Sequence, residues 1–560
     1  MTRSSSDVAA APSTWAPLRH GAFRALWLAA LFSQIGTWMQ LVGAQWLLVD
    51  EPNAATLVSL VQTAATLPIL LVALPAGVLA DSFDRRRLLI AVQLFSFGVA
   101  AALAALTVQD EMTPALLLTL TFALGCGTAM TVPTYLAIVP DLVPRAALPA
   151  ASSLGGISIN VARAVGPAIA GLLVAEVSVA AVFALNALTF LVFTVVLLLW
   201  RAPAGRDSVA EPFVAALRAG GRYIRHSPIM RRYLLRLALF IVPGVALWAL
   251  LPLVASERLR MGADGYGLLL AVLGAGAIAG ATVMPRVRHR FSENQVMVGA
   301  SLVYAAGVAL AAFAREPLVV AVGLLPAGAA WMTVLTNVNA DVQLFLPRWV
   351  RARGLGTYQT VFFGGQALGA LGWGLLADQI GVVPALLAAA ALTAAGAATI
   401  RLWPLIEARH LNREVAVYWP EPRLTVEPDP TAGPVVVHVT YAVPPENEPA
   451  FLTAMARVRR SRRRTGAVQW GLFRPGELGE GFVELYLVPT WGEHLRQHAG
   501  RLTGADEEID RRARELADGP PAVVHLLPVD GVRRSFGPDV DVADDDSDDD
   551  DPDDTEREDH

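Results

Sequence analysis

Long apolar runs separated by short polar or charged links fill the first 404 residues of the chain. A helix needs about 20 predominantly apolar residues to cross a bilayer. Runs of that length recur at roughly 27–49, 56–80, 88–108, 113–139, 149–175 and 178–200, and then at 233–255, 265–285, 295–313, 317–343, 355–377 and 382–403. The pattern predicts an α-helical membrane protein with twelve transmembrane helices in two sets of six.

The pattern changes beyond residue 404, where prolines punctuate a linker and shorter apolar stretches follow. Alternating residues predict strands at 435–443, 468–474, 482–488 and 522–528, and helical spacing predicts helices at 446–465 and 491–516. The order β-α-β-β-α-β is that of a ferredoxin-like α+β domain.

These patterns divide the chain into seven segments. We expect a cytoplasmic N-terminal segment (1–21), a first six-helix half (22–200), a cytoplasmic linker (201–232), a second six-helix half (233–404), a Pro-rich linker (405–434), a soluble domain (435–530) and an acidic disordered tail (531–560).

The composition, 54% hydrophobic and 17% charged, is typical of a membrane protein rather than a soluble one. The net charge of −5 hides a basic body, because residues 539–560 contain 14 acidic residues and one arginine. The chain contains no lysine, so a Gly-rich phosphate loop ending in lysine is excluded, and with it an ATP-driven pump. No motif indicates a cofactor, and nothing indicates nucleic-acid binding.

Arginines predict the orientation of the helices, since positive charge is retained on the cytoplasmic side of short links. The links on one side carry 23 arginines and those on the other carry three. We therefore expect a multi-pass plasma-membrane protein with both termini in the cytoplasm.

The two sets of six also behave as an internal repeat with a constant shift of 203 positions. The shift superposes glycines and arginines in order, including Gly77 on Gly280, Arg85 on Arg288, Gly125 on Gly328, Gly166 on Gly369 and Gly171 on Gly374. Parallel six-helix repeats are characteristic of a large class of secondary transporters.

The charged turn after the second apolar run contains Gly77, Asp81, Asp84, Arg85 and Arg86. It resembles the signature loop of the major facilitator superfamily, which implies a gating role. Gly77 would let two helices approach closely, and Asp81 would pair with an arginine or a helix end only when the cytoplasmic side is closed. The alternative is an ordinary tight turn with cytoplasmic arginines. The second half has Met284 in place of Asp81.

The fifth apolar run contains Gly166, Pro167 and Gly171. This resembles a motif of exporters in the superfamily, although Ala170 stands where a second glycine is common. The alternative is a kinked helix with small packing residues. Arg163 lies about halfway along the same run, so its guanidinium must face a cavity or a polar partner.

Two roles compete for Arg163: attraction of an anionic or carbonyl-rich substrate, and a structural bond to carbonyls and to Asn160. Gln366 is its repeat counterpart, so the expected substrate cavity contains Arg163, Asn160 and Gln366. We expect most other polar residues in the apolar runs to form bonds between helices.

The soluble domain resembles the dimeric ferredoxin-like family that includes small antibiotic-biosynthesis monooxygenases. His494 and His498 are four residues apart, a spacing that could share a metal, but a solvated helix face is the expectation. The basic stretch 457–464 is expected to be a solvated surface, or to contact anionic lipid or the acidic tail.

Together the patterns resemble an efflux branch of the superfamily that includes siderophore and macrolide exporters. That resemblance implies export of a small amphipathic molecule by alternating access, with the proton as coupling ion, in a lipid bilayer. Nutrient uptake is an alternative, and so is a transporter fused to an enzyme domain acting on the transported compound. For the C-terminal domain we favour a regulatory or dimerising role over a catalytic one.

Overall fold

The computed structural model describes residues 14–82, 84–200, 221–347, 349–406, 412, 416, 428–476 and 481–527. The side chains of residues 73–82 lie outside this description. The acidic tail and most of the two predicted linkers also lie outside it.

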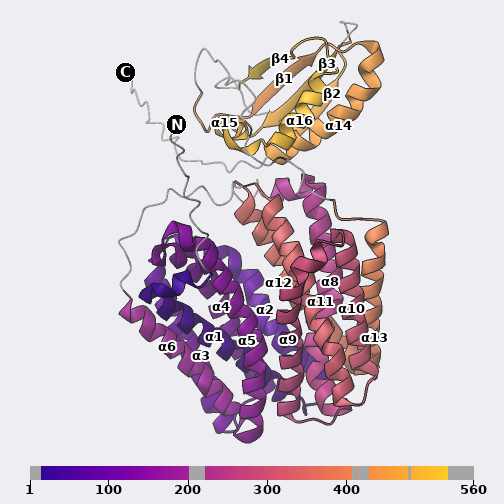
Figure 1. The fold of residues 1–560 in the computed structure, drawn as a ribbon. Helices are drawn as coiled ribbons and strands as arrows, with labels where there is room; N and C mark the ends of the chain where they lie inside the picture. Colours follow the sequence, from indigo (N-terminus) through magenta and orange to yellow (C-terminus); the bar gives the residue numbers. More distant parts are fainter. Residues whose placement is uncertain are drawn as a thin grey trace, which may run out of the picture.

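Two six-helix bundles stand side by side and a smaller α+β unit lies against one end of them (Figure 1). The first bundle contains α1 (Gly21–Trp46), α2 (Ala54–Ser82), α3 (Arg85–Val108), α4 (Pro114–Leu142), α5 (Leu148–Glu176) and α6 (Val179–Leu199). The second contains α8 (Pro228–Leu253), α9 (Ala263–Arg288), α10 (Glu293–Phe313), α11 (Pro317–Phe345), α12 (Arg351–Ile380) and α13 (Val382–Ala398).

Local signals at the short links fix where these helices begin. Ser178 accepts a hydrogen bond from Ala181 N at the start of α6. Ser292 and Gln295 form a reciprocal capping box at the start of α10. Side-chain caps of this kind satisfy amide donors that have no partner within the helix.

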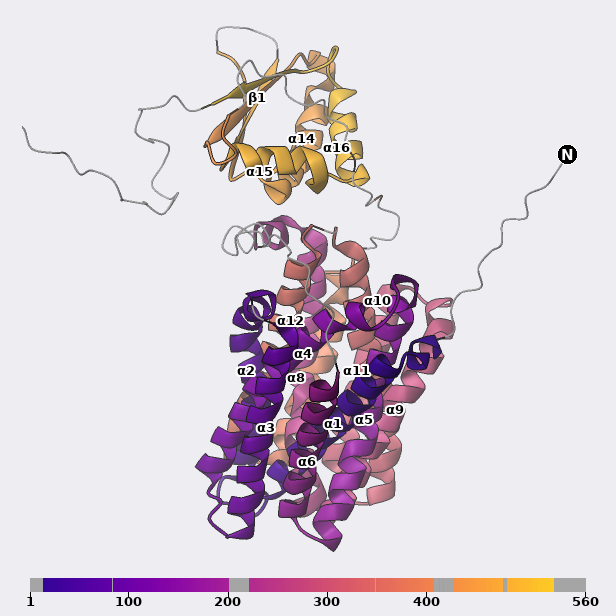
Figure 2. The same cartoon turned by 90° about the vertical axis from the view of Figure 1, so that its left-hand side faces the viewer.

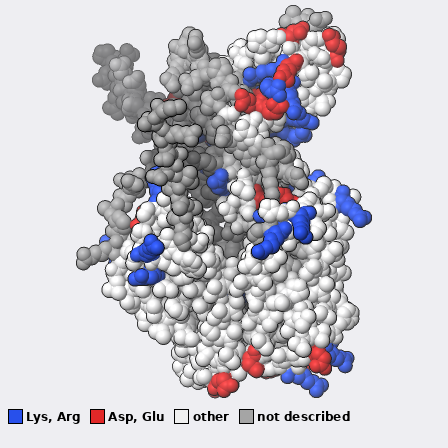
Figure 3. All heavy atoms as spheres, in the orientation of Figure 1, with Lys and Arg blue, Asp and Glu red and all other residues white. Residues whose placement is uncertain are grey.

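Among the described residues, twelve helices are long and apolar enough to cross a membrane, which confirms the predicted number. Charged side chains gather at the two ends of the bundles and leave a wide uncharged belt between them on the face shown in Figure 3. We call the end next to the α+β unit the domain face and the opposite end the far face. The helices alternate in direction, so α1 begins and α13 ends at the domain face.

Both bundles follow one packing plan, as the repeat predicts. In the first, α1 packs on α5 and α6, α2 on α4, and α3 on α4 and α6; in the second, α8 packs on α12 and α13, α9 on α11, and α10 on α11 and α13. The bundles meet through α5 with α9 and through α2 with α12, two contacts that the repeat relates to each other.

The C-terminal unit is a four-stranded antiparallel sheet in the order β2-β3-β1-β4. Its elements are β1 (Val435–Tyr441), α14 (Glu448–Thr465), β2 (Gln469–Phe473), β3 (Phe482–Val488), α15 (Trp491–Arg496), α16 (Gly504–Arg514) and β4 (Ala522–Leu526). This is the predicted element order. Figures 1 and 2 place the helices between the sheet and the transmembrane bundles, with the other sheet face turned away.

The helix predicted at 491–516 is wrong as a single element. It is broken into α15, a π-turn (Gln497–Arg501) and α16. Leu502 is extended, and Thr503 starts α16 with a capping box to Asp506. Gly500 and Gly504 flank the break. Because glycine has a low helix propensity, interrupting the helix there costs little free energy.

The C-terminal unit contacts the start of α8 and the link between α11 and α12. Arg222 pairs with Glu493 at 3.7 Å. The Arg501 guanidinium lies 4.9 Å from the ring centroid of Trp349, within cation–π range. The soluble unit is therefore held against the second bundle, at the ends of the helices that surround the seam between the bundles.

Candidate substrate seam and gate

The gating turn joins α2 to α3. Gly77 and Asp81 lie in the last part of α2, and their side-chain surroundings lie outside the description. Asp84 is the N-cap of α3, and its Oδ1 accepts a 2.9 Å hydrogen bond from Arg87 N. Asp84 thus has a local role in starting α3, and the latch role expected for Asp81 stays a prediction.

The two arginines of the turn bind backbone carbonyls of neighbouring helices. Arg85 Nη1 donates to Ala137 O on α4 at 3.1 Å. Arg86 donates from Nε to Leu197 O and from Nη2 to Leu198 O, both at 2.9 Å. These carbonyls lie at the C-terminal end of α6, where they have no partner within the helix. Arg86 therefore ties α3 to the end of α6.

The repeat counterpart in the second bundle uses a side chain instead. Arg288 donates from Nη2 to Asn337 Oδ1 on α11. Both residues line a cavity of about 120 Å³ at the domain face, together with Asp341 and Glu293. In each bundle, therefore, an arginine at the turn after the second helix binds a neighbouring helix: Arg85 binds α4 in the first bundle, and Arg288 binds α11 in the second.

The motif on α5 lies at its closest contacts with other helices. A Cβ added at Gly166 would lie 2.7 Å from Trp38 Cβ on α1, and one at Gly171 would lie 2.7 Å from Ala263 O on α9. The carbonyl of Pro167 lies against Gly267 of α9. Small residues at such crossings let the backbones touch, so this motif sets how closely α5 approaches both neighbours.

The glycines predicted as repeat partners occupy the matching crossings. Gly369 packs against Val242 and Val245 of α8, as Gly166 packs against α1. Gly374 packs against Ala55 and Ser59 of α2, as Gly171 packs against α9. The two bundles are therefore in contact through paired glycine crossings near the far face.

Arg163 lies on α5 at the seam between the bundles, where Trp38 and Met332 surround it. Its guanidinium carbon is 5.5 Å from the Trp38 ring centroid, and Nη1 lies 3.6 Å from Met332 Sδ on α11. Among the described residues, its buried Nε has no hydrogen-bond partner. A half-buried guanidinium held by a ring and a thioether keeps most of its donor capacity free for a ligand.

Of the two roles weighed for Arg163, the structural one includes a bond to Asn160, and this bond is not formed. Asn160 donates to Gly156 O at 3.0 Å within α5, and its buried Oδ1 has no partner among the described residues. An unpaired donor and an unpaired acceptor thus lie one turn apart on one helix.

Aromatic rings continue this seam into the second bundle. The Trp38 and Trp248 ring centroids are 5.9 Å apart, and those of Trp248 and Trp331 are 5.7 Å apart. These side chains come from α1, α8 and α11, so both bundles build one apolar wall beside Arg163. Such rings suit the apolar part of an amphipathic ligand.

Gln366 lies away from this cluster, in the contact between α12 and α2. Its Oε1 accepts a weak 3.4 Å hydrogen bond from Gln62 Nε2. Nearby, Thr63 Oγ1 donates to Ala367 O at 3.0 Å. The structure therefore gives Gln366 a role in joining the bundles, as expected for most of the other intramembrane polar residues.

Arg236 is a residue whose importance the sequence reasoning missed. It is 2% exposed and donates to Gly396 O, Thr399 Oγ1, Thr399 O and Trp403 O at 2.6–2.9 Å. These groups lie at the C-terminal end of α13, so Arg236 caps that helix from α8. Its position inside the predicted apolar run 233–255 could have indicated that this arginine needs polar partners within the protein.

The expected solvated faces of the soluble unit are wrong for its histidines and for part of its basic helix. His494 is fully buried, and its ring centroid lies 4.5 Å from that of His498 and 4.8 Å from that of His525. Arg462 is also buried, between Glu484 (3.2 Å) and Asp510 (3.0 Å). No group of three metal-binding side chains suited to a metal ion was found among the described residues.

Two six-helix bundles with one packing plan, and glycine crossings between them, define a membrane transporter of the major facilitator fold. The chain belongs to the transmembrane secretion effector family, whose profile matches residues 12–533.

Known relatives agree with this assignment. The chain is 25% identical over 254 residues to the staphyloferrin A transporter of Staphylococcus aureus (strain NCTC 8325 / PS 47), a match that covers 45% of this chain and 64% of that protein. It is 26% identical over 401 residues to the enterobactin exporter EntS of Salmonella typhi, covering 70% of this chain and 94% of the exporter. The crystal structure of a mutant nucleoside transporter NupG has the same fold, with a TM-score of 0.59 at 12% identity over 68% of this chain and all of that one.

Proposed function

We propose that this transporter exports a small amphipathic molecule from the cytoplasm by alternating access, in exchange for protons. The observation that carries the proposal is the cluster of Arg163, Trp38 and Trp248 at the seam between the bundles. An unpaired guanidinium beside apolar rings suits a ligand with an anionic or carbonyl-rich part and an apolar part. The exporter among the relatives supports the direction of transport.

The glycine crossings support the mechanism. The contacts between α5 and α9 extend from Ala164, midway along α5, to Gly171 near the far face. The corresponding contacts between α2 and α12 extend from Thr56 and Asp378 at the far face to Leu70 and Gly364. Both contacts close the far side of the seam, and alternating access would require a second conformation in which these crossings separate. We infer that the domain face is cytoplasmic, because the short links there carry most of the arginines.

The test is transport into inverted membrane vesicles across a panel of siderophores, macrolides and dyes, with an imposed proton gradient. We expect accumulation that collapses with the gradient and falls at least about tenfold in Arg163→Gln, the loss expected for one charge-assisted contact. Arg24→Gln, which changes an exposed arginine at the start of α1, is the control. Accumulation only in right-side-out vesicles would mean uptake and refute export.

Asp81→Asn tests the gate separately. If Asp81 is the acidic part of a latch, this change should lower the transport rate without lowering the amount of inserted protein. Asp84→Asn serves as the comparison, because Asp84 caps α3 locally. Equal rates in Asp81→Asn and the unmodified transporter would refute the latch.

We also propose that the C-terminal units of two copies pair through their open sheet faces. Phe473, Val524 and Leu526 are 54%, 49% and 50% exposed. The strand register places them on the face opposite the helices, together with Val436 and Leu485. Val524→Cys should then give a disulfide-linked dimer in membranes on mild oxidation, whereas a cysteine at exposed Arg512 on the helix side should not.

A further inference from the structure

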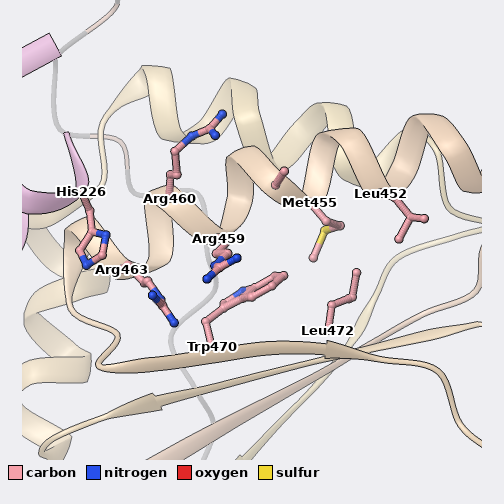
Figure 4. A pocket seen from close by; sticks show the side chains of 9 residues that line it. His226, Leu452, Met455, Arg459, Arg460, Arg463, Trp470 and Leu472 are labelled. Carbon is pink, nitrogen blue, oxygen red and sulfur yellow. The ribbon is translucent and has the colours of Figure 1, made fainter. Parts of the chain in front are cut away.

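A second cavity lies outside the transmembrane seam, where the soluble unit meets the start of α8. Its volume is about 400 Å³, within the range of small-molecule sites. The residues that line it come from α14, from β2 and from the segment just before α8: His226, Leu452, Met455, Ala456, Arg459, Arg460, Arg463, Trp470 and Leu472. Figure 4 shows their arrangement.

One part of this cavity is apolar. Leu452, Met455 and Ala456 follow helical spacing along one stripe of α14, and Leu472 and Trp470 face them from β2. The indole Nε1 of Trp470 donates to Glu484 Oε1 at 2.8 Å. Because this bond anchors the polar edge of the indole, its ring surface is left to contact a ligand.

The other part is basic. Arg459 and Arg463 continue the stripe of α14, and Arg463 lies beside His226 (Figure 4). The Arg459 guanidinium carbon is 5.8 Å from the Trp470 ring centroid. The cavity therefore has an apolar end and a cationic end with a tryptophan between them.

Among the described residues, the cationic end lacks a counter-charge. Neighbouring Arg462 and Arg464 on α14 pair with carboxylates of α16. Within the described part of the chain, by contrast, no carboxylate lies within salt-bridge distance of Arg459, Arg460 or Arg463. The buried Arg463 Nε also has no hydrogen-bond partner there.

The local field is consistent with this imbalance. Burial lowers the pKa of His226, and the positive charges of Arg463, Arg225, Arg459 and Arg222 lower it further. Burial likewise lowers the pKa of Arg463, with contributions from Arg459 and Arg225. A cation whose pKa is lowered by neighbouring positive charges is stabilised when an anion binds beside it.

We propose that this cavity binds a small amphipathic anion, with its apolar part against Leu452, Met455 and Trp470 and its acidic group on Arg459 and Arg463. The ligand would contact α14 and His226 together, so its binding would stabilise the attachment of the soluble unit to α8. The site is separate from Arg163, and ligand binding there does not depend on which molecule is transported. A free carboxylate or an anionic lipid could supply this chemistry.

The test is calorimetric titration of the full-length protein in phosphatidylcholine nanodiscs with naphthalene-2-carboxylate. The neutral naphthalene-2-carboxamide is the matched ligand control. We expect one site per chain and at least about tenfold weaker binding of the amide, since a charge-assisted contact is lost. The double variant Arg459→Gln/Arg463→Gln should lose binding to a similar extent.

Two further variants separate the site from general charge and folding effects. Arg457→Gln changes an exposed arginine of the same helix that does not line the cavity, and it should bind normally. Ala456→Phe fills the cavity and keeps every charge, so it should abolish binding while the thermal unfolding temperature stays unchanged. Nanodiscs with added phosphatidylglycerol identify the source: weaker naphthoate binding there supports a lipid headgroup, and unchanged binding supports a free anion.

Three outcomes would overturn the proposal. Equal affinity for the carboxylate and the amide would show that the arginines do not recognise an anion. An equal loss of binding in Arg457→Gln would show a non-specific charge effect. Binding that appears only after deletion of residues 539–560 would show that the acidic segment of the chain is the occupant.

Discussion

Replacing Gly171 with alanine would place one methyl group in a close backbone contact between the two bundles. The new Cβ would lie 2.7 Å from Ala263 O and 3.0 Å from Gly267 Cα, whereas favourable contacts between such atoms are at about 3.5–4.0 Å. Both obstructing atoms belong to backbone, so α5 and α9 would have to separate by about 0.5–1 Å. Overpacking of this size costs about 1–3 kcal/mol.

That cost acts only on the conformation in which the far face is closed. If the open and closed states differ by a few kcal/mol, a penalty of 1–3 kcal/mol shifts their ratio by about 5- to 150-fold. Gly171→Ala should therefore populate a state in which the far ends of α5 and α9 are apart. Gly155→Ala, on the same helix where an added Cβ meets nothing within 4 Å, should leave the ratio unchanged.

Spin-label distance measurements can detect the shift. Labels at Val177, which is 65% exposed after α5, and at the exposed Glu316 before α11 report separation of the bundles at the far face. Cys126 is replaced by serine in every protein, because it is the one native cysteine. We expect a longer-distance population in Gly171→Ala; identical distance distributions in Gly171→Ala and Gly155→Ala would refute the assigned crossing.

Three further predictions concern stability. Arg236→Ala should lower the thermal unfolding temperature in detergent, because loss of the cap on α13 leaves the buried Gly396 carbonyl unpaired at a cost of about 1–3 kcal/mol and also removes the bonds to Thr399 and Trp403. An unfolding temperature equal to that of Arg24→Ala would contradict this role. Arg462→Met should destabilise the C-terminal unit by about 3–5 kcal/mol, since Glu484 and Asp510 lose their buried partner, as measured by denaturant titration of tryptophan fluorescence against Arg457→Met. Acid should destabilise the same unit. Burial, and then the charge of His498, lowers the pKa of His494 to about 2, below the unfolded value of about 6.5. The unfolded chain therefore binds more protons, and the free energy of unfolding falls as the pH drops below about 6.5. At pH 5 this single group costs about 2 kcal/mol, and hydrogen exchange over residues 435–526 should accelerate in wild type but less in His494→Phe.

The sequence could predict the transmembrane architecture because the features that determine it are either local in the chain or present in both halves of the internal repeat. Each crossing needs only an apolar run of sufficient length. Gly166 and Gly369, or Gly171 and Gly374, are required wherever two backbones touch, so the same crossings reappear 203 residues later. Twelve helices and their pairing into two bundles follow from these two properties.

The same reasoning could not predict contacts between elements that are distant in the sequence. The spacing of His494 and His498 specifies one helix face, but α14 and β4 decide whether that face is covered. Likewise, Arg462 belongs to a run of arginines of which Arg457, Arg459 and Arg460 are exposed. Only Glu484 and Asp510, 22 and 48 residues away, select Arg462 for burial. Period and composition carry no information about such partners.

The two junctions at the domain face show that the repeat places arginines alike and gives them different partners. In the first bundle, Arg85 and Arg86 bind backbone carbonyls, which any sequence of α4 and α6 would supply. In the second, Arg288 binds a side chain of α11 in a cavity that Asp341 and Glu293 also line. Because position 284 is methionine where the first bundle has Asp81, the carboxylates near Arg288 come from α10 and α11 instead of from the helix that precedes the turn. The halves therefore keep their arginines in common and differ in where their acidic groups lie. Under the proposed gating role, the two junctions need not open at the same free-energy cost.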